Sequence, residues 1–347
     1  MMSNLLAVIL NAIPFPAIFV DQSERIFSEN QEAHNLIGKH IHFRHYATIL
    51  RQPSILSSVE SCLRDMLPKS ARVLINYNQR DRIFFVTCRF IAESQYAEHS
   101  GVLIIFQDVT QLEEAGNMQR DFVANVSHEL RSPLTSLIGF IETLKGSARK
   151  DSKTWQHFLE MMEVETNRMN RLVSDLLSLS CFESQQLNLD SKVDIMGVLN
   201  STLHSLQPVL SDAKINLKLK PVKKSIEIFG DSDQLQQVFS NLIENAVKYG
   251  SICGKVTIRI SEYDDDEVLQ MSSVRISISD NGPGIDPIHL PRLTERFYRA
   301  DNHRSRELGG TGLGLAIVKH IISRHKGRLL IESELGEGAN FTVILPK

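Results

Sequence analysis

The sequence predicts an α+β chain made of several domains, and three patterns in its 347 residues support this expectation. Residues 1–110 contain short segments in which apolar and polar side chains alternate, as in antiparallel strands. Residues 111–188 carry two long runs with an apolar residue at every third or fourth position, which is typical of amphipathic helices. Residues 189–347 combine both patterns with glycine-rich turns. We therefore expect three domains with these boundaries.

The first of these domains is expected to mix helices and strands. Its predicted elements are, in chain order, a helix over 5–13, strands at 17–20 and near 25–28, a helical segment from Asn30 to Gly38, and strands at 72–76, 83–90 and 101–108. The period-two alternation of the last three predicts an antiparallel sheet. This order resembles a PAS sensor domain, and the exit Asp108-Val109-Thr110 resembles that family's junction to a signalling helix.

Two cofactors have to be considered for this PAS-like domain. Cys88 resembles the flavin-adduct cysteine of photosensory relatives, but it falls in a late strand, whereas those relatives place the cysteine on an earlier helix. Haem is suggested by four neighbouring histidines, His34, His40, His42 and His45. Histidines in such a helix-to-loop region are more often solvated. We expect a dimer contact or a small unidentified ligand instead.

The second domain, residues 111–188, is expected to be a helical hairpin whose first arm runs over about 112–145, followed by a turn at 146–151 and a second arm that carries the apolar residues from 155 to 182. Each arm has one apolar stripe, formed by Phe122, Val126, Leu130, Leu134, Leu137, Ile141 and Leu144 and by Trp155, Phe158, Met162, Met169, Leu172, Leu176, Leu179 and Phe182. Two helices alone cannot bury stripes of this length, whereas two hairpins can form a four-helix bundle. We therefore expect an obligate homodimer.

His128 lies on the first arm, two residues from both Val126 and Leu130, hence about 200° around the helix from the apolar stripe. Its imidazole is expected to face solvent. Pro133 costs roughly 3 kcal/mol inside a helix, so we expect a bend there. A neutral imidazole can attack an electrophile, and Glu129 can accept the proton from its other nitrogen. The plain alternative is a surface histidine without chemistry.

A helix is predicted over 231–250, where DSDQLQQVFSNLIENAVKYG starts with an aspartate cap and stops at a glycine. Asn241, Asn245 and Lys248 are spaced i, i+4 and i+7, so they share one face, and Tyr249 lies beside them. Amide oxygens suit magnesium, an ammonium suits phosphate, and a phenol ring suits adenine. The alternative is a solvated helix face.

Two glycine-rich turns follow this helix. DNGPGI, at 280–285, comes directly after the alternating strand over 274–280, and GGTGLGL, at 309–315, opens a helix over 316–325. Backbone amides at a helix N-terminus form an anion site that suits a polyphosphate. Neither the Walker pattern nor the dinucleotide fingerprint fits these turns.

Together these motifs resemble the sensor histidine kinases of bacterial two-component systems. SHELRSPLT is similar to the family's H box, NLIENAVKY to its N box, DNGPGI to its first glycine box, ERFYRAD to its F box and GGTGLGLAI to its second glycine box, all in the family's order. The resemblance covers roughly residues 112–347 and is strongest to sensors of the phosphate-regulon type.

The resemblance implies a fold and an activity. The fold is a dimeric hairpin bundle followed, over 189–347, by an α/β-sandwich ATP-binding domain of the histidine kinase, heat-shock and gyrase ATPase type. The activity is that of a protein histidine kinase, which autophosphorylates from ATP with Mg²⁺. The resemblance also implies a partner, the receiver domain of a cognate response regulator, which would receive the phosphoryl group on an aspartate and would be a substrate for dephosphorylation by the same kinase.

The resemblance also implies roles for individual residues. His128 would accept the γ-phosphoryl group with Glu129 as its base, Arg299 would reach the γ-phosphate, and Asn245 would hold Mg²⁺. The other implied nucleotide-binding residues are Asn241 beside the metal, Lys248 at the phosphates, Tyr249 and Asp280 at adenine, and Gly282, Gly284, Gly310, Thr311, Gly312, Leu313 and Gly314 around the pocket. Ser132 stands where the family usually has Thr or Asn, and its shorter side chain leads us to expect a weak phosphatase activity toward the cognate regulator.

Composition argues against several other classes. The formal net charge of −3, without a basic stripe, gives no reason to expect nucleic acid. The cysteines are scattered without a CxxC pair, which argues against disulfides and a structural zinc. The apolar N-terminus is interrupted by Asn11, Pro14 and Pro16 and lacks the basic start of a signal peptide. We therefore expect a cytoplasmic protein with no transmembrane segment in this chain.

Two charged runs lie in the third domain. Residues 264–267 are expected to form a solvated loop between strands at 255–261 and 268–279. The basic run over 292–306 fits either a lid over the triphosphate or a solvated loop.

Two other functions are compatible with parts of the sequence. An ATP-hydrolysing machine of the mismatch-repair or heat-shock type would share the pocket, but it would carry a glutamate where Asn241 stands and lack the histidine helix. The second rival is a silent scaffold that only dimerises.

Overall fold

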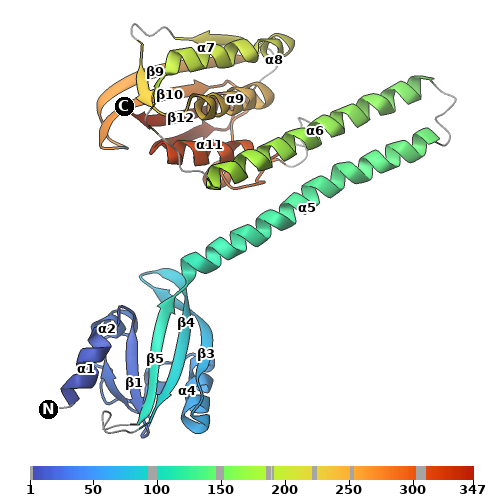
Figure 1. Cartoon of the computed structure of the whole chain (residues 1–347). Helices are drawn as coiled ribbons and strands as arrows, with labels where there is room; N and C mark the ends of the chain where they lie inside the picture. Colours follow the sequence, from blue (N-terminus) through green and yellow to red (C-terminus); the bar gives the residue numbers. More distant parts are fainter. Residues whose placement is uncertain are drawn as a thin grey trace. The chain divides into compact units, whose positions relative to one another are not determined.

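In the computed structural model, the chain forms two compact units, Met1–Ala124 and Asn125–Lys347 (Figure 1). The structure describes residues 3–92, 100–145, 152–184, 189, 191–220, 225–250, 254–301 and 310–347. The expected hairpin turn at 146–151, Cys253 and the basic residues after 301 lie outside these ranges. The domain boundaries expected at residues 110 and 188 stay predictions.

The first unit contains a five-stranded sheet with strand order β2-β1-β5-β4-β3. Its strands are β1 (Ala17–Asp21), β2 (Ile26–Glu29), β3 (Lys69–Tyr77), β4 (Arg80–Ile91) and β5 (Gly101–Asp108). Its helices are α1 (Ser3–Asn11), α2 (Gln31–Ile37), α3 (Tyr46–Ile49) and α4 (Pro53–Asp65). All neighbouring strands pair antiparallel, which confirms the antiparallel sheet expected for this part of the chain.

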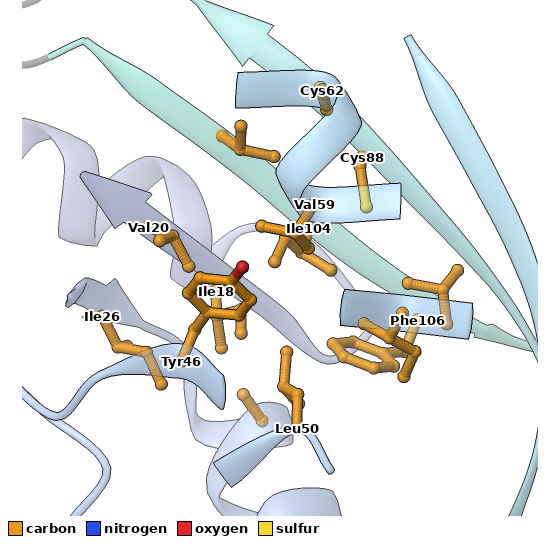
Figure 2. Close-up of a cluster of buried hydrophobic side chains, with 14 of the residues drawn as sticks. Ile18, Val20, Ile26, Tyr46, Leu50, Val59, Cys62, Cys88, Ile104 and Phe106 are labelled. Carbon is orange, nitrogen blue, oxygen red and sulfur yellow. The ribbon is translucent and has the colours of Figure 1, made fainter. Parts of the chain in front are cut away.

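The main core of the first unit is formed by side chains of the sheet together with those of α3 and α4 (Figure 2). Ile18 of β1, Phe106 of β5 and Val59 of α4 are fully buried, and Tyr46 of α3 lies among them. Burial raises the pKa of Tyr46 to about 12. Burial alternates along β2 and β4, as expected for strands that place one face on this core. β1 is buried on both faces, because Ala17 and Phe19 pack with Leu10 of α1 in a second cluster.

The residues weighed for flavin and haem have other surroundings in the first unit. Cys88 lies in β4, which confirms its placement on a strand, and burial raises its pKa to about 12. His34 Nε2 and His42 Nδ1 contact the same carboxylate, that of Glu29, at 3.4 and 3.0 Å. His45 Nε2 contacts Glu24 at 2.9 Å. His34, His42 and His45 are therefore each paired with a carboxylate.

Asn30 connects three elements of the first unit. Its Oδ1 accepts from the backbone N–H of Ala17 at 3.0 Å and of Ala33 at 2.9 Å, so it caps α2 and binds the start of β1. Its Nδ2 donates to the carbonyls of Leu10, Ile13 and Phe15 behind α1. The side chain is buried, and these bonds satisfy it.

Two long helices follow the sheet, α5 (Thr110–Lys145) and α6 (Ser152–Ser184). α5 continues through Pro133, which is buried, and His128 is exposed, as the helix geometry predicted. Leu134 and Ile141 of its apolar stripe, and Ile138 between them, are exposed in the single chain. None of the helices within the described ranges combines the length and the apolar character that crossing a membrane requires.

The rest of the second unit is a two-layer α/β sandwich. Its five-stranded sheet has the order β11-β12-β10-β9-β7, with only the β7–β9 pair parallel among the described strands. The strands are β7 (Asn216–Leu219), β9 (Lys255–Asp266), β10 (Met271–Ser279), β11 (Arg328–Glu334) and β12 (Gly338–Pro346), and β6 (Lys192–Asp194) pairs separately with β8 (Glu227–Phe229). The helical layer contains α7 (Ile195–Ser205), α8 (Gln207–Asp212), α9 (Ser232–Tyr249) and α11 (Gly314–Arg324). Figure 1 shows α9 between α7 and α11, and it packs on both.

The ends of α9 follow the sequence signals. Asp231 Oδ1 accepts from the N–H groups of Asp233 and Gln234 at 3.0 Å, and Gly250 ends the helix. His325, at the end of α11, joins the two helices. Its Nδ1 donates to the Ile321 carbonyl at 2.8 Å, and its Nε2 accepts from the Asp231 N–H at 3.0 Å. Burial lowers the pKa of His325, which keeps this neutral tautomer.

The acidic run at 264–267 corrects one expectation. β9 continues to Asp266 and β10 begins at Met271, so the solvated loop predicted for this run is wrong for Asp266. Its carboxylate is fully buried and accepts from Arg275 Nε at 2.6 Å and Nη2 at 3.0 Å and from Ser273 Oγ at 2.6 Å. The Arg275 guanidinium holds the pKa of Asp266 far below its usual range. The paired arginine makes burial of this carboxylate possible.

Candidate functional site

A cavity of about 620 Å³ lies in the second unit beside α9 and the N-terminal end of α11. The structure brings most of the sequence-predicted residues to its wall, namely Asn241, Asn245, Lys248, Tyr249, Asp280, Gly284, Arg299, Gly310, Thr311, Gly312 and Gly314. Gly282 and Leu313 are buried just behind this wall. His128, Glu129 and Ser132 are on α5 and are not part of the lining.

The polar face of α9 forms one side of this cavity because its opposite face is buried against the sheet and α11. Leu242, Ile243 and Ala246 are at most 1% exposed, which turns Asn241, Asn245 and Lys248 outward. Asn241 Nδ2 donates to the Gln237 carbonyl at 3.0 Å. Its amide nitrogen is thereby held by the helix backbone.

Glu244, which the sequence analysis did not single out, also lines the cavity. Its Oε2 accepts from Lys248 Nζ at 2.9 Å, one helical turn away. The ammonium expected at a phosphate is therefore paired with a carboxylate inside the cavity. An anion bound there would have to compete with Glu244 for Lys248.

The turn after β10 is shaped by Asp280 and two glycines. Asp280 Oδ1 accepts from the Gly282 N–H at 2.8 Å and from the Ala339 N–H at 3.4 Å, and burial raises the pKa of this carboxyl group. A Cβ on Gly282 would lie 2.7 Å from the Tyr249 carbonyl oxygen. Gly284 adopts a φ of 73°, where a side chain would be strained. Both glycines are thus required by the close packing of this turn.

The second glycine turn leads directly into α11. Gly312 has a φ of 73°, its carbonyl accepts from the Phe297 N–H at 2.8 Å, and its missing Cβ would lie 2.9 Å from the Phe297 backbone. A Cβ on Gly314 would lie 2.9 Å from Asn241 Oδ1. The first backbone amides of α11 therefore lie close to the polar face of α9, an arrangement suited to an anion.

A histidine and a tyrosine that the sequence analysis missed also line the cavity. His289 Nδ1 and the Tyr298 hydroxyl form a hydrogen bond of 2.7 Å, and the Arg292 guanidinium lies 4.3 Å over the Tyr298 ring. Tyr298 belongs to the ERFYRAD motif, from which the sequence predicted a role for Arg299 but none for this ring. Neither residue has a periodicity signal that would have marked it.

Glu129, the neighbour of His128, is held by two arginines. Its Oε2 accepts from Arg168 Nη2 of α6 at 3.0 Å and from Arg299 Nη2 at 2.9 Å. The Arg299 side chain is only 5% exposed, and its Nε is buried without a hydrogen-bond partner among the described residues. Arg299 therefore connects the cavity wall with the histidine helix.

A second connection joins the glycine turn to α6. Thr311 Oγ1 donates to Asp175 Oδ2 at 2.7 Å, and Asp175 and Arg171 both line the cavity. The helical spacing of the sequence could have indicated these residues. One face of α6 carries Arg168, Leu172, Asp175 and Leu179. The two leucines are buried, so the charged Arg168 and Asp175 occupy positions on the apolar face of the helix.

The donor set in the cavity fits a divalent cation bound together with phosphates. Asn241 and Asn245 supply amide oxygens, and Glu244 supplies a carboxylate. Across the described ranges, no group of three or more His, Cys, Asp or Glu side chains is arranged to hold a metal ion by itself. Mg²⁺ usually takes only one or two protein ligands and completes its shell with water and phosphate oxygens, so these residues are sufficient for it.

Two family models match the chain. The His Kinase A (phospho-acceptor) domain matches residues 118–185, which include α6 and most of α5. The histidine kinase-, DNA gyrase B- and HSP90-like ATPase matches residues 230–347, which contain the cavity residues of α9 and of both glycine turns.

Individual relatives agree with these two models. The chain is 41% identical over 243 residues to the phosphate regulon sensor protein PhoR of Pseudomonas aeruginosa, covering 69% of this chain and 53% of that protein. It is 30% identical over 346 residues to the sensor protein SrrB of Staphylococcus aureus, covering 99% of this chain and 56% of that protein. The chain thus spans about half the length of the curated relatives it matches.

One solved structure resembles almost the whole chain. The histidine kinase ThkA, crystallised in complex with the response regulator protein TrrA, superimposes with a TM-score of 0.53 and covers 98% of this chain and 97% of its own. The sequence identity is 21%, so the likeness concerns the fold.

Proposed function

The chain belongs to the two-component sensor histidine kinases, and we propose that it transfers the γ-phosphoryl group of ATP to His128 and from there to an aspartate of a response regulator. One observation carries the proposal. Arg299 lines the nucleotide-sized cavity and donates to Glu129, the immediate neighbour of His128. This contact supports a single site that combines the cavity with His128.

ATP would lie in the cavity with its phosphates between α9 and the N-terminus of α11. Lys248 would exchange Glu244 for a phosphate oxygen, and the amides that follow Gly312 would donate to the triphosphate. Tyr249 and Asp280 would bind adenine at the other end. The pKa of Asp280 is raised, but both the protonated and the ionised carboxyl group have an oxygen that can accept a hydrogen bond from the adenine amino group.

Asn245, with Asn241 beside it, would hold Mg²⁺. The ion would neutralise charge on the phosphate oxygens during transfer. The two amides have no charge of their own to oppose the triphosphate, which favours binding of the metal together with the nucleotide.

The transfer itself would form a bond between a His128 ring nitrogen and the γ-phosphorus while the bond from that phosphorus to the ADP oxygen breaks. Glu129 would accept the proton from the other ring nitrogen. Arg299 would turn its guanidinium toward the γ-phosphate, which supplies an acceptor for the buried Nε. When Arg299 turns toward the γ-phosphate, Arg168 would keep Glu129 in place, because Arg168 donates to the same carboxylate oxygen.

The working form would be a homodimer. Leu134, Ile138 and Ile141 of α5 and Val164 and Leu177 of α6 are exposed in the single chain, and a second hairpin would cover them. The first unit, with a strand order that fits a PAS-like domain, would sense a stimulus and pass it along α5. We retain the domain limits 1–110, 111–188 and 189–347 for these three roles. The cytoplasmic location expected from the sequence stays a prediction.

The test is to incubate the full chain with Mg²⁺ and γ-labelled ATP and to separate protein-bound from free phosphate. Phosphohistidine is labile in acid and stable in base, so transfer to His128 predicts acid-labile label on the protein. An ATP-hydrolysing machine would release free phosphate without labelling the protein. A silent scaffold would do neither, and either of these results would contradict the proposal.

A further inference from the structure

Asp175 is a residue of the hairpin that lies at the wall of the nucleotide cavity. It belongs to α6, whereas the rest of the wall is formed almost entirely by the α/β sandwich. The Asp175 carboxylate is partly buried and accepts from Thr311 Oγ1 at 2.7 Å. Burial raises the pKa of Asp175, and Thr311 opposes this rise by donating to the charged form.

Thr311 is held from two sides. Its hydroxyl donates to Asp175, and its oxygen accepts from the Leu313 N–H at 3.3 Å, next to the start of α11. Gly312, between these two residues, has the left-handed φ of 73° and is packed on Phe297. The turn therefore has little freedom, and the rotamer of Thr311 helps to determine where the first amides of α11 point.

The charges near Asp175 argue against direct contact with the nucleotide. Lys248 and Arg171 stabilise its charged form, and Glu244 opposes it. A carboxylate next to a triphosphate would repel it unless a donor stood between them. Thr311 is such a donor, so the Asp175 carboxylate is directed at the turn.

We propose that Asp175 is a positioning residue for nucleotide binding: through Thr311 it orients the glycine turn, so that the hairpin helix α6 sets the shape of the phosphate site. The inference rests on the proposed function, since it takes the turn to bind the phosphates of ATP. α6 would then shape the phosphate site, in addition to forming the dimer and carrying Arg168. Docking of the sandwich on α6 and affinity for ATP are then coupled.

The experiment measures the affinity of the full chain for the non-hydrolysable analogue AMPPNP with Mg²⁺ by calorimetry. Asp175→Leu removes the acceptor and should weaken binding roughly tenfold, as expected for losing a hydrogen bond to a charged group. Asp175→Asn keeps an oxygen that accepts from Thr311 and should stay within about threefold of wild type. Asp121→Leu, at an exposed position of α5, is the matched control and should leave affinity unchanged.

A double-mutant cycle separates positioning from general damage. Thr311→Val removes the same bond from the other side, so the Asp175→Leu and Thr311→Val double variant should bind no more weakly than the worse single variant. Thr311→Val also provides the comparison if Asp175→Leu does not fold. The proposal is overturned if Asp175→Leu binds like wild type, if Asp175→Asn loses as much as Asp175→Leu, or if the two losses multiply.

Binding of AMPPNP requires no phosphoryl transfer, which separates this test from that of the proposed function. A wild-type chain that binds AMPPNP but acquires no acid-labile phosphate would contradict transfer to His128. The comparison between the Asp175 variants would still decide whether α6 positions the turn.

Discussion

Removal of the Arg299 guanidinium should slow phosphorylation of the protein, because this group joins the cavity to the histidine helix. Its Nη2 donates to Glu129 at 2.9 Å, its side chain is almost fully buried, and its Nε is left for an acceptor that the described residues do not supply. Arg299→Ala deletes both interactions. The Glu129 carboxylate keeps one partner, since Arg168 still donates to it at 3.0 Å.

The expected size of the effect follows from these contacts. A hydrogen bond to a charged group contributes about 1.5–3 kcal/mol, and each 1.4 kcal/mol corresponds to roughly a tenfold change in rate. Because Arg168 preserves the orientation of Glu129, we expect the lower part of this range, a loss of roughly 10- to 50-fold. The affinity for AMPPNP should fall less than the rate if Arg299 acts mainly on the γ-phosphate during transfer.

The assay is the initial rate of acid-labile labelling at saturating Mg²⁺ and ATP. Arg328→Ala is the matched control, since Arg328 is exposed at the start of β11 and outside the cavity lining. An Arg299→Ala rate equal to or above that of the control would refute the reasoning. It would mean that the Arg299 contact with Glu129 is neutral or restrains the reaction.

Three further predictions concern stability and the second reaction. Asn30→Ala should lower the free energy of unfolding of the first unit by roughly 3 kcal/mol, because it leaves buried backbone groups unpaired; an unchanged urea midpoint relative to the exposed-site control Asn35→Ala would contradict this. Since burial lowers the pKa of His325 from 6.5, the unfolded chain binds more protons in acid, and the stability of the second unit should fall as pH drops below that value. The His325→Leu variant should lack this part of the pH dependence, and an identical slope in both proteins would speak against the His325 contribution. Ser132→Ala should lose a weak phosphatase activity toward the cognate regulator while autophosphorylation continues; equal dephosphorylation by both forms would rule out a role for the hydroxyl.

The sequence predicted those parts of the molecule in which neighbouring residues determine the outcome. The helix α9 is the clearest case, because its aspartate cap, its terminal glycine and the face shared by Asn241, Asn245 and Lys248 all depend on spacing along one helix. The glycine turns were predicted for the same reason. Only a residue without a side chain fits the backbone at Gly284 and Gly312.

The sequence did not predict contacts between residues that are far apart in the chain. Glu129 and Arg299 are 170 residues apart, and Thr311 and Asp175 are 136 apart, so only the packing of the sandwich on the hairpin brings them together. Asp266 shows a second reason why a sequence-based prediction was wrong. Three aspartates in a row indicate a loop, and the burial of one becomes possible only because Arg275 neutralises it.

The account depends most directly on the identity of the phosphorylated residue. His128→Gln and His157→Gln make a matched pair, because both replace an exposed histidine on one of the two hairpin helices. After incubation with Mg²⁺ and γ-labelled ATP, we expect His128→Gln to bind AMPPNP normally but to carry no acid-labile label, and His157→Gln to be labelled like wild type. Acid-labile label on His128→Gln at the wild-type level would contradict the central claim.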